Sequence, residues 1–131
     1  MPDRTVTAHW LGGYRVDVAA GGFDLRVDEP AEVGGDDTGP QPTDLFLASI
    51  SSCFVLSLAW AARKRELTVE SIDVRVIGTY DGPRFSRIEI EVDLPGDAEQ
   101  VAALIASAER VCYVTNTIKR TPDLEVRWVS G

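Results

Sequence analysis

Residues Pro42–Arg65 read PTDLFLASISSCFVLSLAWAARKR, with no charged residue between Asp44 and Arg63. The run is too long for a strand, and as a helix it would extend roughly 30 Å. Because Leu, Ala, Phe and Val fall on every side of the wheel, such a helix either spans a membrane or lies at the centre of a fold. Serines interrupt the apolar run. In the flanking chain, apolar and polar residues alternate as they do in strands of soluble proteins. We therefore interpret residues 42–65 as a buried central helix that carries Cys53.

Length and composition place the chain among single globular domains. It has 131 residues, of which 44% are hydrophobic and 26% charged, enough for one core and one domain over residues 1–131. The net charge of -8 argues against binding to nucleic acid or to an anionic membrane surface, since both need basic patches. The first ten residues lack the layout of a signal peptide. We therefore expect a cytoplasmic protein with no nucleic-acid or membrane partner.

The counts of cysteine and histidine narrow the possible chemistry. There are two cysteines and one histidine, His9. A Ser-His-Asp triad is therefore disfavoured and a site with several histidine ligands is excluded. Two cysteines in a cytoplasmic chain favour reduced or redox-active thiols over a structural disulfide framework.

The chain before the central helix predicts a meander of three short strands within residues 4–28, because apolar residues alternate with polar ones between glycine turns. Residues 29–41 form a loop rich in Pro, Gly and Asp. Asp36 and Asp37 are adjacent and lack the spaced oxygen ligands that calcium needs, so we interpret the loop as solvated and acidic. Pro42 suits the first helical position, and Asp44 complements the helix dipole.

The chain after the central helix predicts a hairpin over residues 68–94, a helix over 97–111 and a last strand over 123–129. Asp97, with Gln100 three residues later, resembles a capping box for that second helix. Thr115 and Asn116 are candidate caps of one further helical turn. The expected class is α+β, with antiparallel sheets wrapped around the long central helix.

A sheet of this size covers one side of the central helix only. The remaining apolar sides need another cover, and the simplest is a second copy whose helix shares the same core. The residues that we expect on those sides are Phe46, Ile50, Phe54, Leu58 and Trp60.

Cys53 on its own would more often be a packing residue than a nucleophile, because burial raises the pKa of a thiol. Ser49 and Ser57 lie one turn away on its face, as hydrogen-bond donors or as small packing residues. Cys112 follows the apolar stripe of the second helix. If both helices pack in one core, the two thiols come within reach of a disulfide, which is the arrangement of a thiol peroxidase or a redox sensor. Zinc binding is disfavoured without a CxxC pair.

Two stretches resemble the OsmC/Ohr family of osmotically induced and organic hydroperoxide resistance proteins. The first is FDLRVDEPAEVGGDDTGPQPTDLFLASISSCF, residues 23–54, with a GG loop, a helix start of the P-x-(E/D)-L-F type and a Cys-Phe pair. The second is AERVCYVTNT, residues 108–117, which is similar to A-E-x-x-C-P-V-S-N-T, with Tyr113 in place of the proline. The order of elements agrees as well.

This resemblance implies an intertwined homodimer with active sites at the subunit interface. It implies that Cys53 is the peroxidatic cysteine and Cys112 the resolving one. An arginine from the meander and a glutamate near the helix start would activate the thiolate. Here the glutamate position falls on Thr43, with Asp44 as the adjacent acid, and Arg15 is the nearest arginine. Asp44 and Cys53 would be about 13 Å apart along one helix, so an acid that assists Cys53 must come from the partner subunit.

The expected function is reduction of organic hydroperoxides through a Cys53 sulfenic acid and a Cys53–Cys112 disulfide, with no cofactor and no metal. A dithiol would reduce the disulfide, and a dithiol of the lipoyl type is a candidate. The alternative is an OsmC-like dimer that binds a small apolar or electrophilic molecule without turnover. The loss of the family glutamate at Thr43 favours this alternative.

Overall fold

The computed structural model describes residues 2–129. The chain divides into two compact units, Met1–Ala48 and Ser49–Gly131, and the division falls inside the central helix.

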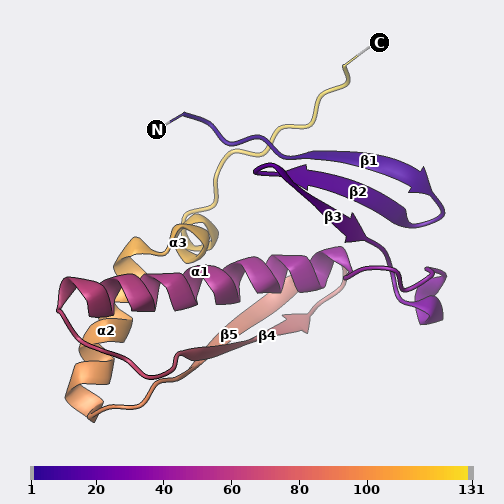
Figure 1. Cartoon of the computed structure of the whole chain (residues 1–131). Coiled ribbons are helices and arrows are strands. Elements are labelled where there is room, and N and C mark those ends of the chain that lie inside the picture. The colour runs from indigo at the N-terminus through magenta and orange to yellow at the C-terminus, as the bar shows by residue number, and fades with distance from the viewer. Residues whose placement is uncertain (1, 130–131) are drawn as a thin grey trace. The chain divides into compact units, whose positions relative to one another are not determined.

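The N-terminal unit contains the predicted meander. Strands β1 (Thr7–Gly12), β2 (Arg15–Ala20) and β3 (Phe23–Val27) form an antiparallel sheet in the order β1-β2-β3 (Figure 1). Val18 on β2 lies opposite Leu25 on β3, so the alternating apolar residues share one face of the sheet. The prediction of three strands within residues 4–28 is confirmed.

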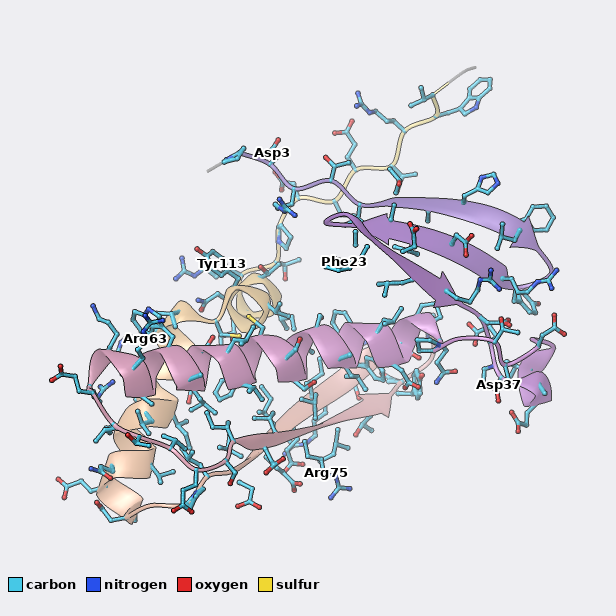
Figure 2. The ribbon with its side chains drawn as sticks, viewed as in Figure 1. Asp3, Phe23, Asp37, Arg63, Arg75 and Tyr113 are labelled. Atoms are coloured by element: carbon cyan, nitrogen blue, oxygen red, sulfur yellow. The ribbon has the colours of Figure 1, made fainter. Side chains whose placement is uncertain are left out.

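The loop after β3 is organised by Asp28, whose side chain is completely buried. One carboxylate oxygen accepts hydrogen bonds from the peptide N–H groups of Glu29 at 2.7 Å and Asp36 at 3.4 Å. The other accepts from the Thr38 N–H at 3.0 Å and from its hydroxyl at 2.6 Å. The Thr38 hydroxyl bond leads the interactions that lower the pKa of Asp28 to about 2, against a smaller opposing effect of burial. Asp36 and Asp37 are exposed, as expected of a solvated loop, and Asp37 is labelled in Figure 2. The anchoring role of Asp28 was not predicted.

Two glycines allow this loop to fold back on the chain. A Cβ atom at Gly35 would overlap the peptide of Glu29, and one at Gly39 would overlap the carbonyl of Arg26. Gly34, at φ 99°, ends the short 3-10 helix η1 (Ala31–Val33). The Gly-rich composition of the loop is therefore a packing requirement.

The central helix α1 spans Pro42–Lys64, one residue shorter than predicted, with Asp44 in its first turn. By length and composition alone it could cross a membrane. Its burial is one-sided: Leu58 is fully buried, whereas Leu56 is 69% and Trp60 45% exposed. The expectation that Phe54 and Leu58 need cover from a second copy is wrong, because both lie in the core of their own chain. Ile50 is also fully buried.

The C-terminal unit completes the fold with a hairpin and two helices. Strands β4 (Asp73–Tyr80) and β5 (Phe85–Asp93) pair antiparallel inside the predicted hairpin. Helix α2 (Ala98–Val111) has Asp97 as its N-cap, and α3 (Tyr113–Lys119) follows after Cys112. The core consists of Phe54, Leu58, Ala61, Ala62, Leu104, Ala108 and Cys112, with apolar residues of β4 and β5 packed against it.

The predicted last strand over 123–129 is wrong. Residues 121–129 form no strand and run as an extended coil (Figure 1). Leu124, Val126 and Trp128 alternate as in a strand but are about nine-tenths exposed, at 92%, 92% and 90%. A strand is held by hydrogen bonds to a neighbour, and within the described chain no strand pairs with this segment. The α+β class with two antiparallel sheets is confirmed.

Candidate thiol site

Two helices bring Cys53 and Cys112 to the same core. Cys53 lies near the middle of α1, and Cys112 is the residue between α2 and α3. Cys112 is fully buried within the core, and the half-buried Cys53 packs against that core. Both are free thiols. The C-terminal unit thus holds both residues that the sequence singled out.

The surroundings of Cys112 stabilise its thiolate. Burial raises the pKa of Cys112, but hydrogen bonding outweighs this effect and leaves the pKa below its ordinary value. The donors are the side chain and peptide of Thr115, followed by the side chains of Cys53 and Ser57. Since the thiolate is the reactive form, this environment favours nucleophilic behaviour of Cys112.

Two buried hydroxyls contact the backbone of the two cysteines. Ser57 Oγ donates to the carbonyl oxygen of Cys53 at 2.8 Å, and Thr115 Oγ1 lies 3.4 Å from the carbonyl oxygen of Cys112. Each residue is 7% exposed. The sequence indicated Ser57 as a donor near Cys53, but it indicated Thr115 only as a helix cap. The signal for Thr115 was its place one turn after Cys112, where side chains of a helix face the same side.

Cys53 also lines an open cleft of about 910 Å³ in the C-terminal unit. Its walls combine apolar and aromatic side chains with two arginines and a few polar groups. Tyr113, at the start of α3, is one of the aromatic residues (Figure 2). The lining residues are Cys53, Leu56, Ser57, Trp60, Arg110, Val111, Tyr113, Asn116, Thr117, Arg120 and Pro122.

The Arg110 side chain forms a hydrogen bond within its own helix, α2. Its guanidinium donates to the Ser107 hydroxyl at 3.1 Å, and Arg65 at the end of α1 donates to the same hydroxyl at 2.7 Å. Asn116 Nδ2 donates to the Arg110 carbonyl at 3.1 Å. These bonds connect α2 with α3 and with the residue that follows α1, and both arginines lie near helix C-termini, where the dipole favours cations.

Arg15 and Asp44 belong to the N-terminal unit, whereas both thiols belong to the C-terminal unit. Arg15 Nη1 lies 3.9 Å from a carboxylate oxygen of Asp36. Its Nε is buried and has no hydrogen-bond partner among residues 2–129. Asp44 is the acid in the first turn of α1. Their roles in activating Cys53 stay predictions.

Residues 2–129 contain no cluster of side chains suited to binding a metal ion. No group of three or more His, Cys, Asp or Glu side chains gathers there in a way that could hold an ion.

Comparisons with known proteins agree with the fold. Residues 34–127 match the family described as OsmC-like protein. The organic hydroperoxide resistance protein of Xanthomonas axonopodis pv. citri is 29% identical over 108 residues, which cover 78% of this chain and 76% of that protein.

Solved structures of other proteins share the fold of this chain. The OsmC-like protein from Mycoplasma pneumoniae superposes with a TM-score of 0.76 at 16% identity, covering 92% of this chain and 89% of that one. An organic hydroperoxide resistance protein from Elizabethkingia anophelis superposes with a TM-score of 0.68 at 25% identity, covering 92% and 91% of the two chains. With its family match over most of the sequence and its fold shared with these structures, the chain belongs to the OsmC-like protein family.

Proposed function

We propose that the protein is a thiol-dependent peroxidase that reduces organic hydroperoxides. The Cys53 thiolate attacks the distal oxygen of the peroxide, the O–O bond breaks, and the alkoxide takes up a proton to leave as the alcohol. Cys53 is left as a sulfenic acid. Cys112 then displaces the hydroxyl group, which leaves as water, and a Cys53–Cys112 disulfide forms.

The observation that carries this proposal is the arrangement of the two thiols. Cys53 lines a cleft from which a substrate can approach, whereas Cys112 is fully buried in the core against which Cys53 packs. An accessible thiol with a second thiol behind it is the layout of a peroxidase that resolves its own sulfenic acid. Relatives named organic hydroperoxide resistance protein support the same reading.

The cleft favours an organic peroxide over hydrogen peroxide. Leu56, Trp60 and Val111 offer apolar surface beside Cys53. Burying a hydrocarbon group against such surface contributes about 0.8 kcal/mol per methylene, and hydrogen peroxide has no such group.

Activation of Cys53 is proposed to use Arg15 and Asp44, with the acid supplied by the partner subunit, because Asp44 and Cys53 would be about 13 Å apart along their own helix. Thr43 stands where the family resemblance places a glutamate, so Asp44 is the acid nearest to that position. In this proposal the positive charge of Arg15 stabilises the Cys53 thiolate, and Asp44 orients the guanidinium. The partner-free Nε of Arg15 leaves a donor available for such an acid.

We further propose a homodimer. The exposed Leu56 and Trp60 on α1, and the exposed apolar residues of segment 121–129, support it, since a second copy would cover surface that a soluble monomer rarely leaves open. A small dithiol, with the lipoyl type as the candidate, would reduce the disulfide. The cytoplasmic location stays a prediction.

The second candidate function is binding of a small apolar or electrophilic molecule without turnover. Two observations favour it: Thr43 replaces the family glutamate, and Arg15 already lies near Asp36 in its own unit. The pH dependence of Cys53 alkylation discriminates between the two functions. A pKa well above the ordinary value of about 8.5 would favour binding.

The test of the proposed function is consumption of cumene hydroperoxide by the purified protein with excess dithiol. Turnover is expected for the wild type and not for Cys53→Ser, and hydrogen peroxide is expected to react more slowly. Equal consumption by wild type and Cys53→Ser would overturn the proposal.

A further inference from the structure

The cleft beside Cys53 differs in charge from the rest of the chain. The protein carries 21 acidic residues against 13 lysines and arginines, which gives a net charge of -8. The cleft reverses this balance, because its lining includes Arg110 and Arg120 and contains no aspartate or glutamate. Its walls therefore hold a local surplus of positive charge in an acidic protein.

No carboxylate of the described residues pairs with either arginine: the ion pairs of this part of the chain lie elsewhere. Arg110 donates to the neutral hydroxyl of Ser107. The acid next to it in sequence, Glu109, pairs with Lys119 at 3.6 Å and lines a different cavity. The charges of Arg110 and Arg120 are therefore available to a bound anion.

A third cation stands at an apolar wall of the same cleft. Lys64 Nζ lies 5.6 Å from the centre of the Trp60 ring, and Trp60 lines the cleft together with Leu56 and Val111. Small-molecule sites combine apolar walls with a few polar groups that fix the orientation of the ligand. Apolar walls bordered by cations fit a ligand with a hydrocarbon body and an anionic group.

We propose that the cleft selects hydroperoxides that carry a carboxylate, and that Arg120, with Arg110 beside it, is the specificity-determining residue that binds this group. The proposal rests on the proposed peroxidase function and adds to it the charge of the substrate and the residues that recognise it. A guanidinium can bind a carboxylate through two parallel N–H···O bonds. The wall of Leu56 and Trp60 takes the hydrocarbon part.

Arg120 leads this assignment because Arg110 is already bonded to Ser107. The backbone N–H of Arg120 bonds to the Asn116 carbonyl oxygen at 3.0 Å and ends α3. This bond fixes the base of the side chain at the cleft, while the side chain itself is exposed to an incoming ligand.

The groups proposed to activate Cys53 leave the charge surplus in place. Arg15 and Asp44 have opposite charges, so the pair adds no net charge to the site. A second copy that covers the outer sides of Leu56 and Trp60 would place the cleft at the subunit boundary. Each experiment therefore uses the full chain in its native assembly.

The first test measures binding without peroxide. Octanoate, octanol and octylammonium share a hydrocarbon chain and differ in charge. Each is tested for protection of the Cys53 thiol against the neutral reagent iodoacetamide, in a Cys112→Ser variant. Octanoate should protect at the lowest concentration and octylammonium at the highest. Exposed ion pairs contribute about two- to fivefold in affinity, so Arg120→Gln should raise the protecting concentration of octanoate by that factor and leave that of octanol unchanged.

Arg84→Gln is the matched control, because it changes the net charge by the same amount. Arg84 pairs with Asp81 at 3.2 Å in the turn between β4 and β5 and is not part of the cleft lining. It should keep the wild-type preference for octanoate, and Arg120→Lys should restore part of the preference that Arg120→Gln loses. An equal loss in Arg84→Gln and Arg120→Gln would overturn the role of Arg120.

The second test makes the same comparison during turnover. Cumene hydroperoxide with a para-carboxylate is compared with its methyl ester, which keeps the ring and the peroxide and removes the charge. The wild type should favour the carboxylate in kcat/KM by about two- to fivefold. Arg120→Gln should remove this advantage through a higher KM at an unchanged kcat, as expected for a group that binds substrate and transition state alike.

Equal protection by octanoate and octanol, together with equal kcat/KM for the two peroxides, would overturn the inference even if the wild type is an active peroxidase. A preference for octanoate that depends on Arg120, in a protein that consumes no peroxide, would instead overturn the proposed function and leave a binding site for apolar carboxylates.

Discussion

Oxidation should make this protein markedly harder to unfold. Cys53 and Cys112 lie on different helices, so a disulfide between them closes a loop of about 60 residues, and the chain-entropy relation gives about 4 kcal/mol of stabilisation for such a loop. For a chain of this length the unfolding entropy converts each kcal/mol into about 3–4 °C. The expected rise in unfolding temperature is therefore about 15 °C.

The assay is thermal unfolding followed by circular dichroism, before and after one equivalent of cumene hydroperoxide without reductant. Cys112→Ser is the control, because it can form the sulfenic acid but not the internal disulfide. A shift in the wild type that a dithiol reverses and that Cys112→Ser lacks is the expected result. An unchanged or lower unfolding temperature in the oxidised wild type would refute the reasoning that the two thiols meet within one core.

Three further predictions concern the fold around the site. Leu58→Ala should lower the free energy of unfolding by about 2–5 kcal/mol because Leu58 is fully buried. Val33→Ala, at a residue that is 59% exposed and outside the surface proposed for the second copy, should change it by less than about 0.5 kcal/mol. Urea unfolding measures both, and equal losses would contradict the burial of Leu58. Gly35→Ala should destabilise the loop after β3, because the new methyl group overlaps the Glu29 peptide; limited proteolysis would detect it, and wild-type resistance would refute the close approach. The pKa of Asp28 is depressed from 3.8 to about 2, so its contribution to stability is present above about pH 4 and is lost as the pH falls toward 2. Asp28→Asn should remove this part of the acid dependence, and an unchanged profile in urea titrations at several pH values would contradict the assignment.

The helix that carries Cys53 could be predicted from the sequence because an uncharged apolar run of that length has few soluble solutions. Its one-sided burial could not, since the residues that cover Phe54 and Leu58 come from α2 and the hairpin, much later in the chain. The proximity of the two thiols followed from placing both on helices with apolar faces.

Sequence patterns missed the buried role of Asp28 and wrongly indicated a strand in the segment 121–129. Asp28 looks like one more acid in an acidic region, and its burial depends on donors from Glu29, Asp36 and Thr38 that fold back around it. Leu124, Val126 and Trp128 have the alternation of a strand, but alternation describes only which face a side chain occupies. Whether a strand forms depends on a pairing partner, which sequence alternation does not supply.

The central claim is that a hydroperoxide oxidises Cys53 and that Cys112 resolves it within the same chain. Its most direct test is the intact mass of the reduced protein after one equivalent of cumene hydroperoxide under denaturing, thiol-blocking conditions. The account predicts a loss of two hydrogens, no blocked thiol and no covalent dimer. Retention of two free thiols, or a disulfide-linked dimer in place of the internal bond, would contradict it.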